Sequence, residues 1–202
     1  MKAYAPTRKM LFLSVRVVTI TLLLSTMTWL TLPVVITHTA LAQTAIIPTC
    51  YGHTATIVGT PQSENIVGTV GDDVIVTLDG RDRVHGRGGD DIICGGSGPN
   101  TLIGGAGEDL IDGGAGSDFL SGGIDDDRII GGIDNDIIFG EYGEDRLEGG
   151  AGNDTLLGQA DNDFLFGDAI DGSTGSHNID SGDGGSEFDI CVNVETVTNC
   201  EG

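Results

Sequence analysis

Hydrophobic and polar residues between positions 59 and 166 recur with a period of nine. Written in rows of nine, this segment gives twelve rows without a gap. The eighth position of every row is aliphatic: Ile66, Ile75, Val84, Ile93, Leu102, Ile111, Leu120, Ile129, Ile138, Leu147, Leu156 and Leu165. Gly opens eleven rows and holds the fourth position in eight. Such a fixed period indicates a repeat architecture.

One aliphatic residue per nine predicts a three-residue strand at positions seven to nine, with a single inward side chain. Two rows then complete a turn of 18 residues, so the strands stack in two parallel sheets with rungs about 4.8 Å apart. Between strands the chain must reverse with positive φ, which Gly tolerates. Asp125, Asp134 and Asp161 replace Gly at the fourth position and can also adopt that conformation. The pattern therefore predicts an all-β, two-sheet solenoid.

The rows follow the pattern GGxGxDxUx, where U is aliphatic, and the chain here resembles the hemolysin-type (RTX) calcium-binding repeat proteins. The resemblance covers 108 residues. It implies a right-handed parallel β-roll of twelve nine-residue repeats with capped ends. It also implies that each Ca²⁺ lies between one loop and the loop one turn later, held by Gly-segment carbonyls and pairs of sixth-position Asp: Asp91 with Asp109, Asp109 with Asp127, Asp118 with Asp136, Asp127 with Asp145, Asp136 with Asp154, and Asp145 with Asp163.

The candidate metal ligands are the ten Asp residues at the sixth position. They are Asp73, Asp82, Asp91, Asp109, Asp118, Asp127, Asp136, Asp145, Asp154 and Asp163. Carboxylates and carbonyls on flexible loops suit a hard cation of the size of calcium, whereas Zn²⁺ prefers nitrogen or sulfur. Glu64, Thr77 and Asn100 depart from the pattern, which weakens the expectation for sites in their loops.

Charge supports a cation as the partner. The first acid is Glu64, and from there on five Arg and no Lys face 31 Asp and Glu, a net charge of −26. Nucleic acid and anionic membrane surfaces should repel such a chain. The aliphatic core is thin and the acidic rows repel each other, so we expect several Ca²⁺ ions to be needed for folding. The alternative, a disordered acidic linker, is the expected state of the calcium-free chain.

Residues 1–42 are typical of a secretory signal peptide. A basic start precedes the uncharged segment 17–37, and Ala40 and Ala42 supply the small residues of a cleavage site. An uncharged run of 21 residues is also long enough to remain as an uncleaved membrane anchor. With cleavage, the sequence predicts an extracellular protein that is not inserted in a membrane.

The four Cys of an exported chain favour disulfides. The chain also resembles small exported family members around Cys50 and Cys94, and we expect pairs Cys50–Cys94 and Cys191–Cys200. Residues 43–58 would form an N-terminal cap, 59–166 the roll and 167–202 a C-terminal cap, in which Asp189 and Cys191 resume positions six and eight. If Cys50 pairs with Cys94, residues 50–58 must fold back over the first turns, because a continuous coil would separate the two by roughly 11 Å.

No catalytic motif accompanies the repeats. The three His after residue 42 lie at an outward position or in irregular ends, and the spacing of nine explains the carboxylates better as ligands. The sequence therefore predicts an exported, non-enzymatic calcium-binding protein. Two alternatives remain: an unrecognised extracellular enzyme, and a calcium-dependent adhesion or surface-layer component with a cell-surface or self-association partner. The outward apolar strip that motivates the second comprises Ile103, Phe119, Ile137, Phe139 and Leu157.

Overall fold

The computed structural model describes residues 47–168, 181–185, 189–192, 196–198 and 200. The expected signal peptide lies outside these residues, as does much of the expected C-terminal cap. All regular elements in the described part are β-strands. The same residues contain no helix with the length and apolar character needed to cross a membrane.

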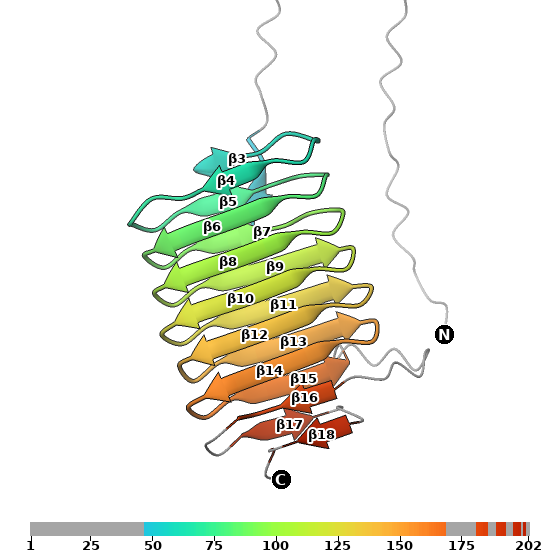
Figure 1. The fold of residues 1–202 in the computed structure, drawn as a ribbon. Coiled ribbons are helices and arrows are strands. Elements are labelled where there is room, and N and C mark those ends of the chain that lie inside the picture. The colour runs from blue at the N-terminus through green and yellow to red at the C-terminus, as the bar shows by residue number, and fades with distance from the viewer. Residues whose placement is uncertain (1–46, 169–180, 186–188, 193–195, 199, 201–202) are drawn as a thin grey trace, which may run out of the picture. The chain divides into compact units, whose positions relative to one another are not determined.

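The strands form two parallel eight-stranded sheets, and the chain alternates between them (Figure 1). The odd sheet contains β3 (Ile57–Val58), β5 (Val74–Val76), β7 (Ile92–Cys94), β9 (Leu110–Ala115), β11 (Arg128–Ile133), β13 (Arg146–Ala151), β15 (Phe164–Asp168) and β17 (Ile190–Val192). The even sheet contains β4 (Asn65–Val67), β6 (Arg83–Gly88), β8 (Thr101–Ala106), β10 (Phe119–Ile124), β12 (Ile137–Tyr142), β14 (Thr155–Ala160), β16 (Ser181–Asp183) and β18 (Thr196–Thr198). The predicted parallel β-roll is confirmed.

The register advances by one turn of 18 residues at each step through the repeats. Leu120, for example, pairs with Leu102 on one side and Ile138 on the other. All twelve aliphatic residues of the eighth position form one buried core between the sheets. Those from Ile75 onward are fully buried except Val84, which is 2% exposed. The two predicted stacks of six are therefore both present.

The strands in the middle of the array are longer than predicted. β6 and the strands from β8 to β14 have six residues and run from the seventh position of one row to the third of the next. The prediction of three was wrong because the second and third positions also join the ladder: Gly123 pairs with Gly105 and Ile124 with Ala106. Positive φ falls at the second and fourth positions, and Asp125 adopts it with φ of 79°.

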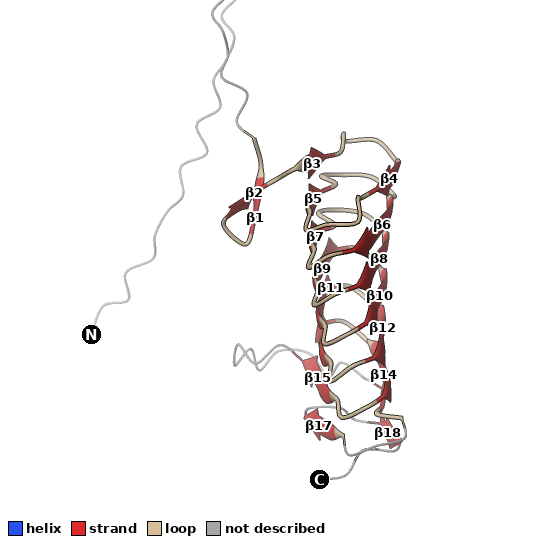
Figure 2. Cartoon of the chain, turned by 90° about the vertical axis from the view of Figure 1, so that its left-hand side faces the viewer, coloured by secondary structure: helices blue, strands red, loops and turns tan. Residues whose placement is uncertain are grey.

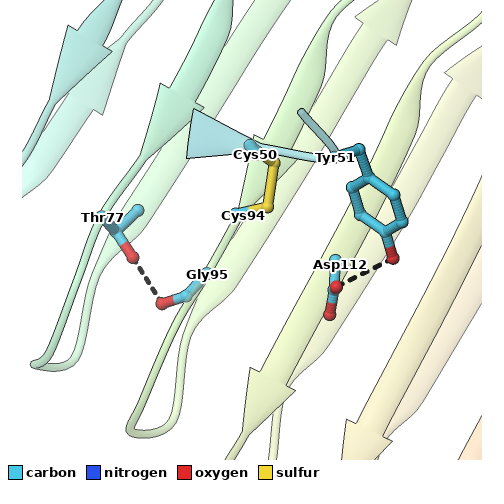
Figure 3. The surroundings of a disulfide bond; sticks show 6 residues. All are labelled: Cys50, Tyr51, Thr77, Cys94, Gly95 and Asp112. Carbon is cyan, nitrogen blue, oxygen red and sulfur yellow. Dashed lines mark hydrogen bonds between the residues drawn. A yellow bond between two sulfur atoms is a disulfide. The ribbon is translucent and has the colours of Figure 1, made fainter. Parts of the chain in front are cut away.

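The N-terminal end carries a short hairpin. β1 (Thr49–Cys50) and β2 (His53–Thr54) pair antiparallel, beside the odd sheet (Figure 2). A disulfide joins Cys50 to Cys94 in β7, and the hydroxyl of Tyr51 donates to Asp112 Oδ2 at 2.9 Å (Figure 3). The segment thus folds back as far as Thr54, whereas β3, expected within the cap, already joins the ladder by pairing with β5.

The C-terminal end continues both sheets beyond the twelve rows. Cys191 of β17 pairs with Leu165 of β15 and packs against the core, as its place at an eighth position predicts. A disulfide joins Cys191 to Cys200.

Candidate metal centres

The sixth-position residues form two buried columns, each linked along its length by hydrogen bonds. The backbone N–H of one residue donates to a carboxylate oxygen (Oδ1) of the residue one turn later; Asp109 N donates to Asp127 at 2.8 Å, and Asp127 N to Asp145 at 2.8 Å. Every pair that the resemblance implied is joined in this way. Since a stacked strand fixes both amide and carboxylate, the fold itself places these acids next to each other.

The second carboxylate oxygen, Oδ2, accepts no hydrogen bond in eight of these residues although it is buried. They are Asp82, Asp91, Asp109, Asp118, Asp127, Asp136, Asp145 and Asp163. A buried charged oxygen without a partner costs far more than a lost hydrogen bond. These oxygens therefore require a positive charge or a proton.

In the rows that have Gly at the first position and Asp at the sixth, the glycine lies against the Oδ2 of the same row. Gly59 lies against Glu64 Oε2 and Gly95 against Asn100 Nδ2, and the row of Asp82 opens with Thr77. A Cβ added to Gly122 would lie 2.1 Å from Asp127 Oδ2. One added to Gly86 would lie 2.1 Å from Asp91 Oδ2 and 2.7 Å from the carbonyl oxygen of Gly104. The opening glycine is therefore needed for space, because a side chain there would collide with the carboxylate.

Asn100 shows which group an Oδ2 faces. Its Oδ1 accepts the amide of Asp82 at 2.9 Å, as an Asp would, but its Nδ2 donates to the carbonyl of Gly95 at 2.9 Å. An Asp in the same place would set two oxygen acceptors opposite each other. Two acceptors can both be satisfied by a cation between them, so the donor set of carboxylate and carbonyl oxygens fits a hard metal ion.

The pKa values agree with this need. Burial raises the pKa of Asp127 to about 8, although the hydrogen bond from the Asp109 amide opposes it and neighbouring Asp charges add to it. Burial likewise raises the pKa of Asp136 to about 8 and of Asp109 to about 7. In a metal-free roll these three carboxyls would therefore resist ionisation near neutral pH, where a bound cation would keep them ionised.

The structure separates the ten predicted ligands into groups. Nine occupy equivalent buried places, but Asp73 differs because its Oδ2 already accepts the Thr69 amide at 2.7 Å. Asp189, absent from the predicted ligand set, is fully buried and accepts the Asp163 amide at 2.9 Å. Its sixth-position spacing from Gly184 was the available signal. Within the described residues no three His, Cys, Asp or Glu side chains converge on one point.

The comparison with family models decides the relationship. The model of the RTX calcium-binding nonapeptide repeat, which spans four copies, matches six overlapping segments that together run from residue 58 to 169. The chain belongs to the RTX calcium-binding repeat family. Comparison with curated proteins found no significant match. The family match covers the same rows whose acids form the two columns, so the RTX repeats and the buried carboxylates are one feature.

Proposed function

We propose that this RTX repeat protein is exported and non-catalytic, and that it folds by binding several Ca²⁺ ions between stacked loops. The observation that carries the proposal is the set of buried Oδ2 atoms that accept no hydrogen bond and crowd the opening glycines. At neutral pH, a cation that compensates the buried carboxylates would stabilise a fold that stacks them in a column.

The proposed ligands are the sixth-position carboxylates together with first-position carbonyls, such as that of Gly95, which faces the sixth-position side chain of its own row. The residues are nine of the ten Asp named from the sequence, to which we add Asp189. Asp73 is left out because its Oδ2 already accepts the Thr69 amide. Bound calcium would supply positive charge between the loops of two successive turns, so that each turn completes the metal sites of the next. Oxygen donors without His or Cys favour Ca²⁺ over Zn²⁺, and glycine-rich loops favour it over Mg²⁺, which demands stricter octahedral geometry.

An extracellular location follows from the calcium requirement and the sequence. Calcium is scarce in the cytosol, so the chain would be exported unfolded and ordered after release. The two disulfides agree with an oxidising compartment.

Circular dichroism of the purified protein tests the proposal. Addition of Ca²⁺ to the chelated protein should produce the sheet signal, and Mg²⁺ at the same concentration should not. The same sheet signal in EDTA and in calcium would refute it.

A second candidate function is calcium-dependent adhesion, favoured by the outer face of the even sheet. Phe119 is 40% and Ile137 43% exposed, and the rings of Phe119 and Phe139 lie 5.1 Å apart. A groove of about 390 Å³ beside them is also lined by Arg81 and Arg83.

The small number of acidic residues in the loops beside this groove favours an anionic partner. The loops that enter the even sheet carry no acid at the exposed fifth position: Ser63, Arg81, Pro99, Ser117, Asn135 and Asn153. The loops that enter the odd sheet carry five acids there: Asp72, Asp90, Glu108, Asp126 and Glu144. An anionic polymer on a cell surface could therefore approach the loops that enter the even sheet without meeting a row of carboxylates.

Adhesion is tested by binding of the calcium-loaded protein to cells. The double variants Phe119→Ser/Phe139→Ser and Arg81→Gln/Arg83→Gln should lose binding, whereas Arg128→Gln on the odd sheet should retain it. Equal binding by all variants would exclude this face.

A further inference from the structure

The first two loops of the roll are closed by their own backbone. Glu64 Oε2 accepts the amide of Thr60 at 2.6 Å, and Asp73 Oδ2 accepts the amide of Thr69 at 2.7 Å. In both, the donor is the second residue of the row and the acceptor is the sixth. Asp73 Oδ1 also accepts the hydroxyl of Thr56 at 3.1 Å. In these two rows, the second side-chain oxygen of the sixth-position residue accepts a backbone amide, whereas the corresponding oxygen farther along the array has no hydrogen bond.

The Gly95 carbonyl is satisfied by protein as well. It accepts the hydroxyl of Thr77, one turn earlier (Figure 3). It also accepts the Nδ2 of Asn100 at 2.9 Å. A carbonyl oxygen has two lone pairs, so these two donors occupy it fully. Thr77 and Asn100 are two of the positions where the repeat pattern fails, and the structure brings both failures to the same atom.

A covalent link adjoins this carbonyl. Cys94, the residue before Gly95, is bonded to Cys50, and the neighbouring Tyr51 reaches forward to Asp112 (Figure 3). The hairpin β1–β2 is therefore fixed across the odd sheet at the level of the two hydrogen bonds to Gly95.

The next part of the array lacks these substitutes. In the rows of Asp109, Asp118, Asp127, Asp136 and Asp145, each Oδ2 is buried without a hydrogen bond. In the rows before Asn100, all of which the structure describes, only Asp82 and Asp91 share that condition. The array thus changes near Asn100. In three of the first five rows, those of Glu64, Asp73 and Asn100, a protein group bonds the second terminal atom of the sixth-position side chain, and in the next five rows none does.

We propose that the N-terminal section, from β3 to β8, folds without calcium and serves as the template on which calcium orders the later turns. The proposal rests on the proposed function, because it states which loops the metal must order. In a solenoid each turn is stabilised by the turn before it. If the turns from β3 to β8 are already folded, the later turns can order on them one after another, without first forming a folded calcium-bound turn of their own.

Hydrogen exchange measured by mass spectrometry on the disulfide-intact protein tests the proposal. In EDTA, peptides from residues 74–103 should exchange at least about tenfold more slowly than peptides from 119–166, and calcium should protect both. Equal exchange of the two segments in EDTA would overturn the template. Failure of calcium to slow exchange in 119–166 would instead overturn the proposed function, so the two failures are distinguishable.

Two single variants test the hydrogen bonds to Gly95. Asn100→Asp and Thr77→Gly each restore the repeat pattern, and each should make protection of 74–103 calcium-dependent; Asn100→Asp should also add bound calcium. Asn135→Asp makes the same chemical change at an exposed fifth position and should leave the exchange of 74–103 in EDTA unchanged. Unchanged protection in both test variants, or equal loss in the control, would refute the assignment. The wild-type comparison decides the matter even if a variant fails to fold.

Discussion

Replacement of Asp127 by Asn should have opposite effects with and without calcium. Asp127 accepts the amide of Asp109 through Oδ1, and its Oδ2 is buried without a hydrogen bond. Asn keeps the accepting oxygen and places an amide nitrogen where Oδ2 was, as Asn100 does naturally. The variant therefore keeps the hydrogen bond of the column and removes the charge that needs a cation.

The magnitude follows from the raised pKa. The folded pKa of Asp127 is about 8, against an ordinary value of 3.8. At pH 7 the folded, calcium-free protein must protonate a group that the unfolded chain keeps ionised, at a cost of about 4 kcal/mol. Asn avoids this cost, and its new hydrogen bond contributes about 1 kcal/mol. The calcium-free roll should therefore gain about 3 to 5 kcal/mol.

With calcium the sign reverses, because Asp127 would hold the ions shared with Asp109 and with Asp145. Each lost charged contact should cost about 1.5 to 3 kcal/mol. Two titrations followed by circular dichroism measure the effects: trimethylamine N-oxide in EDTA, and calcium without the osmolyte. Asp127→Asn should lower the first midpoint and raise the second.

Asp126→Asn is the matched control. Asp126 is exposed and lies one residue away from Asp127. Its replacement by Asn removes the same charge and should change both midpoints less than Asp127→Asn does. Destabilisation by Asp127→Asn in EDTA as well as in calcium would show that its Oδ2 does not lack a partner, and the reasoning would fail.

Three further predictions concern pH, the core and the turns. In EDTA, lowering the pH from 8 to 5 should increase the sheet signal. Carboxyls whose folded pKa is raised to about 6 to 8 stabilise the fold when protonated, and this stabilisation is lost as the pH rises through that range. An unchanged or smaller sheet signal at pH 5 would contradict this. Leu120→Ala, at a fully buried position, should cost about 2 to 5 kcal/mol in urea unfolding of the calcium form, and Phe119→Ala at the surface should cost less. Gly132→Ala should lower the stability strongly, because φ is +115° and the new Cβ would lie 2.2 Å from the Gly114 carbonyl oxygen. Gly71→Ala should lower it only slightly, because the new Cβ meets nothing within 4 Å. Equal losses of stability would argue against this turn geometry.

The nine-residue period predicted the core of the fold because it marks the one inward side chain of each strand. It could not predict the six-residue strands, since ladder hydrogen bonds at the second and third positions involve backbone alone. Glycine there indicates a turn as readily as a strand. The fold-back of Cys50 followed from distance, but the place of Tyr51 against Asp112 depends on a tertiary contact that no spacing reveals.

The candidate site was predictable as a column of carboxylates but not in its exceptions. Asn100 departs from the pattern in the sequence, yet only the structure shows that its amide donates to the Gly95 carbonyl. Asp73 matches the pattern, and its closure by the Thr69 amide depends on a local backbone conformation. Asp189 stands beyond a break in the period, so its alignment with Asp163 required the path of the chain through β16 and β17.

The most direct test of calcium-driven folding is equilibrium dialysis of Ca²⁺ combined with light scattering on the same disulfide-intact protein. About five to ten ions should bind per chain, and the hydrodynamic radius should fall over a narrow calcium range as the turns beyond Asn100 order. Sodium chloride in EDTA should not reproduce the change, because screening relieves repulsion without bridging the loops. One or two bound ions, or the same compact radius in EDTA, would contradict the account.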